Sequence, residues 1–221
     1  MRKCRICFEK TGKAKYVSHL DLMRAFQRLF VRSGVSIKHT EGFNPHPYMV
    51  FALPLSVGTE SRCELADFEL TDDNEALETI PERLTAKASE GIVFKEAYIP
   101  QRKLKDIFYI EAEGIFEYDN GVSSETVSAL QGLFEADEII IPKKTKKGIS
   151  DTDIKPGIKS ISFDLKDNCT ITVRAVVTAL NPSTNPELIA AAVRNKLPGF
   201  APDFAEFKRL NFLDADLNIF R

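Results

Sequence analysis

The order in which hydrophobic periodicity changes along the chain most limits the folds that it can adopt. In "KCRICFEKTG", Cys4, Ile6 and Phe8 fall on one face of an extended chain, which predicts a half-buried strand. "SHLDLMRAFQRLFVRSG" then has helical spacing, with Ser18 placed as an N-terminal cap and Gly34 as a C-terminal cap. The first half continues with strand patterns at 48–55 and 62–71, a helical pattern at 73–91 and a strand pattern at 92–100.

The resulting order, β-α-β-β-α-β, defines the split-βαβ or ferredoxin-like arrangement. A second copy with one additional strand follows, its patterns lying at 107–118 (strand), 123–136 (helix), 137–145 (strand), 159–177 (two strands), 185–197 (helix) and 204–213 (strand). We therefore predict an α+β protein of two tandem ferredoxin-like sandwich subdomains. Residues 1–100 and 107–221 form these subdomains, and the polar segment 101–106 is predicted to be the linker.

Charge is distributed unevenly along this chain of 221 residues. The formal net charge is −2, yet the first 50 residues hold ten basic and three acidic side chains, a local net charge of +7. A basic N-terminal region indicates an anionic partner better than the overall charge does. No apolar run approaches the roughly 20 residues of a membrane helix, and no signal-peptide core is present, so we expect a cytoplasmic protein without membrane contact.

Cysteine spacing and known catalytic motifs exclude several classes of enzyme. Cys4 and Cys7 have C-x-x-C spacing, but positions three apart on a strand point to opposite faces, and no second pair exists. The three-cysteine signature of radical-SAM enzymes is absent, as are a glycine-rich phosphate loop, G-x-S-x-G and H-E-x-x-H. We therefore predict no metal site and no cofactor.

Two groups of basic residues are candidates for phosphate binding. Arg24, Arg28 and Arg32 recur at every fourth position of the first predicted helix, so they form one stripe on its surface. His19 stands at the N-terminus of this helix, where free amide groups favour an anion. The second group is the run Lys143, Lys144, Lys146 and Lys147. Either group can bind phosphates by charge, although a solvated basic surface is the alternative interpretation.

The segment "HTEGFNPHP" between the first helix and the next strand pattern is predicted to be a rigid loop. Its two prolines exclude a helix, and Gly42 permits a positive φ at the turn. Asn44 and Phe43 are candidates for contacting a base, and His46 is a candidate for proton transfer, as is His19. The alternative is that the loop only connects two elements.

"YVSHLDLMRAFQRLFVRSG" followed by "HTEGFNPHPYMVFALPLSVGTES" resembles the radical-SAM-linked protein family, which is also catalogued as a domain of unknown function. The resemblance covers most of the chain and is specific in its first 70 residues. It rests on the residues His19, Asp21, Arg24, Gly42, Phe43, Asn44, Pro45, Pro54, Leu55, Gly58 and Glu60. Tyr48 departs from the pattern, because a basic residue is more usual there. The resemblance implies that the protein acts in RNA maturation or modification alongside a radical-SAM protein. It does not imply a mechanism.

The segment "GISDTDIK" is similar to a G-R-x-D-x-D-V-R stretch of one pseudouridine synthase branch, and that likeness implies Asp151 as a catalytic candidate. A solvated Lys-rich hairpin is the alternative. Three functions are left open by the sequence. The first is an RNA-binding accessory protein acting with a radical-SAM partner. The second is a protein-interaction subunit of a radical-SAM enzyme that does not contact RNA. The third is an enzyme that modifies or cleaves RNA, either pseudouridine-synthase-like or a metal-free nuclease.

Overall fold

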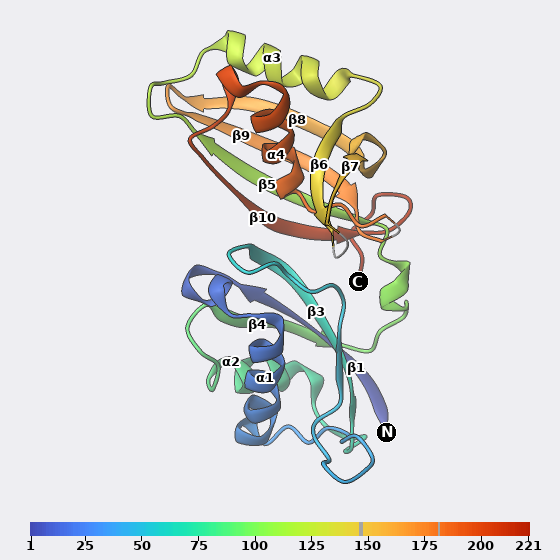
Figure 1. The fold of residues 1–221 in the computed structure, drawn as a ribbon. Coiled ribbons are helices and arrows are strands. Elements are labelled where there is room, and N and C mark those ends of the chain that lie inside the picture. The colour runs from blue at the N-terminus through green and yellow to red at the C-terminus, as the bar shows by residue number, and fades with distance from the viewer. Residues whose placement is uncertain (146–147, 181) are drawn as a thin grey trace. The chain divides into compact units, whose positions relative to one another are not determined.

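The computed structural model describes residues 1–145, 148–180 and 182–221. The chain forms two compact units, the first comprising residues 1–106 with Arg221 and the second comprising residues 107–220. Each unit has its own antiparallel strands and its own helices (Figure 1). The predicted α+β class is confirmed.

The first unit is built on a sheet with the strand order β4-β1-β3-β2, in which neighbouring strands are antiparallel. Its elements along the chain are β1 (Arg2–Lys10), η1 (Gly12–Tyr16), α1 (His19–Ser33), β2 (Met49–Phe51), β3 (Glu60–Leu70), η2 (Leu77–Thr79), α2 (Ile80–Thr85), β4 (Ile92–Tyr98) and η3 (Leu104–Asp106). Helices α1 and α2 lie on the same face of this sheet (Figure 1). The opposite face carries no α-helix of this unit; the 3-10 turn η3 lines it, and we call it the helix-free face below.

Helix α1 begins and ends where its capping residues predict. The Ser18 hydroxyl accepts a hydrogen bond from the backbone N–H of Asp21, which satisfies one of the free donors of the first turn. Gly34 follows the helix with a φ of 71°, a left-handed conformation that glycine adopts without a Cβ clash. The apolar face of α1 is buried against the sheet through Leu22, Phe26, Leu29 and Phe30.

An aromatic cluster forms the centre of the first unit's core. The Phe8 ring is fully buried, and its centroid lies 4.9 Å from that of Phe26 and 5.7 Å from that of Phe94. Phe51 adds an edge-on contact to Phe8 at 6.1 Å. Strand β1, helix α1 and strands β2 and β4 therefore meet at one group of rings, as the alternation of β1 predicts.

Two first-unit elements are shorter than predicted, and a proline accounts for each. The helix expected at 73–91 is reduced to the single turn η2 and the six residues of α2. Pro81 lies in the first turn of α2, the one helical position that tolerates its missing N–H, so the helix starts there. The strand expected at 48–55 is only Met49–Phe51, because Pro54 cannot donate to a strand ladder.

The second unit has a sheet with the strand order β10-β5-β9-β8 and a separate hairpin, β6-β7. Its elements are β5 (Tyr109–Glu117), α3 (Ser124–Glu135), β6 (Ile140–Thr145), β7 (Gly148–Asp153), η4 (Lys155–Gly157), β8 (Ile158–Asp167), β9 (Thr170–Thr178), α4 (Glu187–Lys196), η5 (Pro198–Phe200) and β10 (Phe204–Leu213). Phe134 of α3 packs on Phe163 of β8, with ring centroids 5.5 Å apart. We interpret the two strand orders as split-βαβ units, the second containing the inserted β6-β7 hairpin.

Candidate functional site

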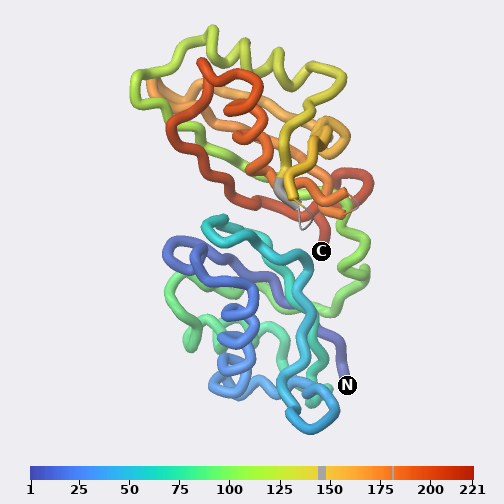
Figure 2. The backbone as a smooth tube through the Cα atoms, viewed as in Figure 1, coloured from blue at the N-terminus to red at the C-terminus, as the bar shows by residue number. Residues whose placement is uncertain are grey.

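The two catalytic histidine candidates lie at opposite ends of α1. His19 is the first residue of the helix, and its half-buried ring packs edge-on against Phe51 at 5.4 Å. His46 belongs to the segment that follows α1 and projects past the C-terminal end of the helix (Figure 2). Helix α1 rises about 1.5 Å per residue, so its 15 residues separate these two ends by about 20 Å. The two histidines do not share a cleft.

Glu60, one of the residues that carry the family resemblance, lies near the N-terminal end of α1. Its Oε1 accepts a hydrogen bond of 2.8 Å from the backbone N–H of Gly12 in η1. In the same region, the buried Lys10 donates to the carbonyl oxygens of Lys15 and Val17 at 3.2 and 2.8 Å. Burial lowers the pKa of Lys10. These contacts anchor the chain leading into α1, so we assign them a structural role.

The loop at 40–46 is closed by its own hydrogen bonds. The N–H of Thr40 donates to the carbonyl of His46 at 2.8 Å, and the N–H of His46 donates to the Thr40 hydroxyl at 3.2 Å. Nδ1 of His46 lies 3.1 Å from the carbonyl oxygen of Asn44 and 3.2 Å from the hydroxyl of Thr40. The loop thus presents a fixed shape, with Phe43 completely exposed.

The arginine stripe of α1 is exposed, and two of its members already have partners. Nη1 of Arg24 is 3.2 Å from the carboxylate of Asp21, and Nη2 of Arg32 donates to the carbonyl of Lys87 at 3.0 Å. Arg28 is exposed between them. Because α1 buries its other face against the sheet, the stripe points away from the sheet on the helical side of the unit.

The second-unit candidates lie on the β6-β7 hairpin. Asp151 is exposed in β7 and pairs in register with Pro142 of β6. Lys143 and Lys144 belong to β6, whereas Lys146 and Lys147 lie outside the described residues. Asp151 therefore lies on an exposed two-stranded hairpin.

The cysteine pair shows why its spacing does not create a reactive site. Cys4 faces the core and is fully buried, whereas Cys7 lies on the other face of β1. Burial raises the pKa of Cys4 to about 12 and that of Cys7 to about 11, so both thiols are protonated at neutral pH. In the part of the chain that the structure describes, no group of three or more His, Cys, Asp or Glu side chains is arranged to hold a metal ion.

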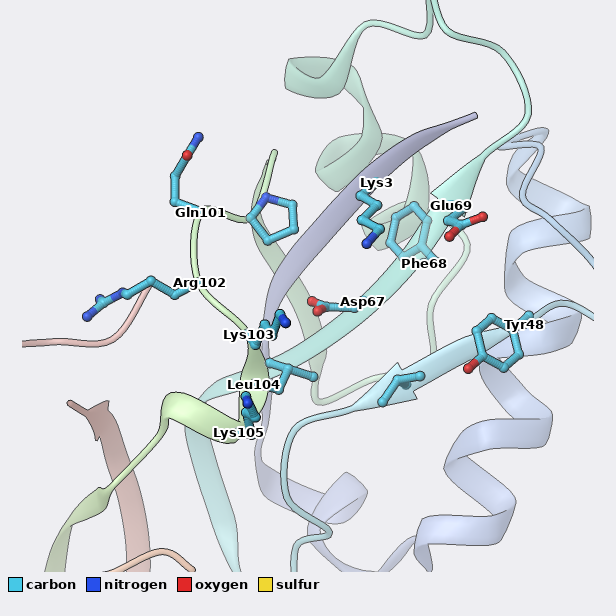
Figure 3. A pocket seen from close by; sticks show the side chains of 12 residues that line it. Lys3, Tyr48, Asp67, Phe68, Glu69, Gln101, Arg102, Lys103, Leu104 and Lys105 are labelled. Carbon is cyan, nitrogen blue, oxygen red and sulfur yellow. The ribbon is translucent and has the colours of Figure 1, made fainter. Parts of the chain in front are cut away.

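A hollow of about 550 Å³, which the sequence did not predict, lies on the helix-free face of the first unit (Figure 3). Its floor is formed by outward-facing side chains of β1 and β3, because the alternate residues of these strands point into the core. One wall is Tyr48 and Val50, and the other is the segment 100–105. The volume falls within the range of roughly 300–1,000 Å³ that is typical of small-molecule sites.

A buried arginine links the floor of this hollow to one of its walls. Arg5 of β1 is fully buried, and its Nε and Nη2 donate to the two carboxylate oxygens of Asp67 at 2.6 and 2.9 Å. Nη2 also donates to the backbone carbonyl of Arg102 at 2.9 Å, which ties the segment 100–105 to the sheet. Burial lowers the pKa of Arg5, but the hydrogen bond and charge of Asp67 more than compensate, and the net shift is upward. The guanidinium therefore stays charged.

The hollow carries an excess of positive charge. Among the described residues, its lining includes the basic side chains Lys3, Arg102, Lys103 and Lys105 and the carboxylates Asp67 and Glu69. Arg5 neutralises Asp67, and Lys38 lies 3.3 Å from the carboxylate of Glu69. Lys3, Lys103 and Lys105 are exposed to solvent. An anion entering the hollow therefore meets ammonium groups whose neighbouring carboxylates are already paired.

The chain is thus an α+β protein whose first unit carries a cationic hollow with Tyr48 at its edge. The chain belongs to the family described as an uncharacterized protein conserved in bacteria (DUF2344), which matches residues 3–186. No curated protein matches the sequence significantly. In the described part of the chain, no helix has the length and apolar character needed to cross a membrane.

Two solved structures were compared with the fold. A chain in the crystal structure of a Cbf5-Nop10-Gar1 complex matches with a TM-score of 0.51 and 10% identity, over 93% of this chain and 47% of that chain. The present chain thus spans about half the length of that relative, and the low identity shows similarity of fold alone. An unknown protein from Galdieria sulphuraria matches at 9% identity over 94% of this chain and 98% of its own, but its TM-score of 0.27 is too low to indicate a shared fold.

Proposed function

We propose that this protein binds single-stranded RNA along the helix-free face of its first unit. The observation that carries the proposal is the cationic hollow with Tyr48 at its edge (Figure 3). Single-strand sites combine these two features, because Lys and Arg neutralise phosphates while bases stack on exposed aromatic rings. Tyr48 is 47% exposed, which leaves its ring available for such stacking.

The rigid loop at 40–46 extends the same surface. Its stem is held by a bridge between His39 and Pro47 and by a hydrogen bond from the N–H of Tyr48 to the carbonyl of Lys38. Tyr48 therefore belongs both to the stem of the loop and to the wall of the hollow. An RNA strand can follow the hollow by its phosphates and meet Phe43 at the loop, so the loop would supply selectivity that phosphate contacts lack.

The first test changes the charge of the hollow. Lys103→Glu combined with Lys105→Glu is expected to weaken binding of a single-stranded RNA by at least about tenfold at low salt, because two phosphate contacts become repulsive. Each phosphate contact contributes about 0.7 to the slope of log K against log salt for single strands, so the slope should fall by about 1.4. Fluorescence anisotropy across a salt series measures both quantities.

The arginine stripe supplies the matched comparison for this test. Arg24→Glu combined with Arg28→Glu makes the same change of charge on the opposite side of the sheet, and we expect it to have the smaller effect. If the arginine variant lost affinity while the lysine variant kept it, RNA would bind on α1 and the hollow would be the wrong surface. Unchanged binding by both variants, or no binding by the unmodified protein at low salt, would remove the RNA proposal.

The resemblance to the radical-SAM-linked family supports a second part of this proposal, namely that the protein presents RNA to a radical-SAM enzyme. Its own chain lacks the three-cysteine signature, so the reactive chemistry would belong to the partner. We expect a radical-SAM protein to co-purify with the tagged chain from native cells and to remain bound after ribonuclease treatment. Recovery of RNA without any radical-SAM protein would contradict this partnership and leave RNA binding intact.

A further inference from the structure

We infer that the exposed face of helix α1 docks an acidic amphipathic helix of a partner protein. This inference concerns the helical side of the first unit's sheet, so it does not depend on RNA binding at the opposite face. It starts from two features that phosphate binding does not need. One is a line of exposed apolar side chains along α1, and the other is a pocket at the C-terminal end of that helix.

Leu20 and Val31 mark the two ends of the apolar line. Their side chains are 63% and 70% exposed, whereas the core residues of α1 are at most 6% exposed. Successive residues of a helix turn by about 100°, so positions eleven apart differ by about 20° and lie on one side, about 16 Å from each other. Isolated apolar side chains are common on surfaces, but an aligned pair on an exposed helix face provides a seam for a second helix.

The apolar line ends at a pocket of about 410 Å³, which we call the anchor pocket. Val31 and the buried Phe30 line its helical side, and Val35, Ile37 and Pro47 line it from the chain that follows α1. Among the described residues that line this pocket, none is an aspartate, glutamate, lysine or arginine. The pocket therefore suits an apolar side chain, and protein interfaces are commonly anchored by one such side chain that fills a pocket.

The charge of α1 favours an acidic partner. Residues 19–33 contain three arginines and one aspartate, a formal net charge of +2. Arg24, Arg28 and Arg32 are exposed and follow one flank of the apolar line. Charged residues beside an apolar seam determine which helix can dock, so aspartates or glutamates on the partner would face these arginines.

Selection from a displayed library of helical peptides against the intact chain tests this inference. Peptides of about 20 residues are used, because they span the 15 residues of α1. Enriched peptides should share an apolar seam flanked by acidic residues, and fluorescence anisotropy of the tightest one should show weaker binding as salt rises. A selection that enriched no peptide, or only peptides without acidic residues, would overturn the inference.

Two substitutions at exposed apolar positions locate the bound peptide. Val31→Glu should weaken its binding by at least about tenfold, because the new carboxylate lies beside the anchor pocket and opposite an acidic partner. Ile149→Glu is the matched control, since it makes the same kind of change at a side chain that is 76% exposed on the β6-β7 hairpin. This control should leave the affinity unchanged. Undiminished binding by the Val31 variant, or equal losses in both variants, would contradict docking on α1.

The two double variants introduced for RNA separate the partner surface from the RNA surface. Arg24→Glu with Arg28→Glu should weaken peptide binding by at least about tenfold, whereas Lys103→Glu with Lys105→Glu should preserve it and weaken RNA binding. Loss of the peptide from the lysine variant alone would overturn the inference, and so would loss of RNA from the arginine variant alone, because RNA would then occupy α1. Peptide binding with this pattern in a protein that bound no RNA would support the inference and remove only the proposed RNA function.

Discussion

Replacing Phe8 with alanine is expected to destabilise the first unit by about 3–5 kcal/mol, the cost of removing a buried phenylalanine. The Phe8 side chain is completely inaccessible and contacts the rings of Phe26, Phe51 and Phe94. Four elements therefore lose packing at one point, and the cavity cannot be closed by movement of a single loop. Urea unfolding followed by circular dichroism measures the loss, and hydrogen exchange of the β1 and β3 amides locates it in the first unit.

Phe43→Ala is the control, because it removes the same side chain from an exposed position. Its side chain is fully exposed at the loop, so Phe43→Ala should change the free energy of unfolding by no more than about 0.5 kcal/mol. A loss of several kcal/mol from Phe43→Ala would mean that the loop packs against the unit in solution. A loss below about 1 kcal/mol from Phe8→Ala would contradict the aromatic cluster as the centre of the core.

Replacing Asp67 with alanine is expected to destabilise the first unit by about 3 kcal/mol, because it leaves the buried guanidinium of Arg5 without its carboxylate. We place the effect at the lower end of the range for buried pairs, since Asp67 itself is partly exposed. Arg5→Met added to Asp67→Ala should recover most of the loss, because it removes the unpaired buried charge. Urea unfolding of the single and double variants measures both steps.

The ion pair between Lys38 and Glu69 provides a comparison, because Glu69 lies on β3 as Asp67 does. Its ammonium-to-carboxylate distance is 3.3 Å, and both side chains are substantially exposed, so Glu69→Ala should cost no more than about 1 kcal/mol. Equal losses from the Asp67 and Glu69 variants would contradict the role of Arg5 as the buried anchor of the hollow. Failure of the double variant to recover stability would point instead to the bond between Arg5 and the carbonyl of Arg102.

Local features of the fold could be predicted because they depend on neighbouring residues. The capping pattern of Ser18 and Gly34 defines both ends of α1, and the alternation around Phe8 identifies the buried face of β1. Proline effects are also local: Pro81 lies in the first turn of the helix expected around it, and that helix is six residues long. Short-range interactions thus allow the existence of an element to be predicted more reliably than the residues at which it ends.

The hollow could not be predicted, because its parts are distant in the sequence. Arg5 occupies an outward-facing position of β1, where alternation predicts exposure, yet it is fully buried and hydrogen-bonded to Asp67 and to the carbonyl of Arg102. These partners are 62 and 97 positions away, and nothing in the strand pattern specifies the pairing register that brings them together. The predicted linker 101–106 thus supplies most of a wall of the hollow.

The same limit applies to the histidines. His19 and His46 are separated in the sequence by only one helix and one loop. Helix α1 rises about 1.5 Å per residue, however, so its 15 residues place its two ends about 20 Å apart. Composition identifies the histidines as candidate proton-transfer groups, but it gives no information on their separation. The loop at 40–46 is better understood through its closed hydrogen bonds and the exposed Phe43 than through its histidine content.

Cross-linking of single-stranded RNA to the intact protein, with the attachment sites identified by mass spectrometry, tests the central claim most directly. If RNA lies along the helix-free face of the first unit, cross-links will form at Tyr48, at Phe43 and on the segment 100–105. Cross-links confined to α1 or to the second unit would contradict this account.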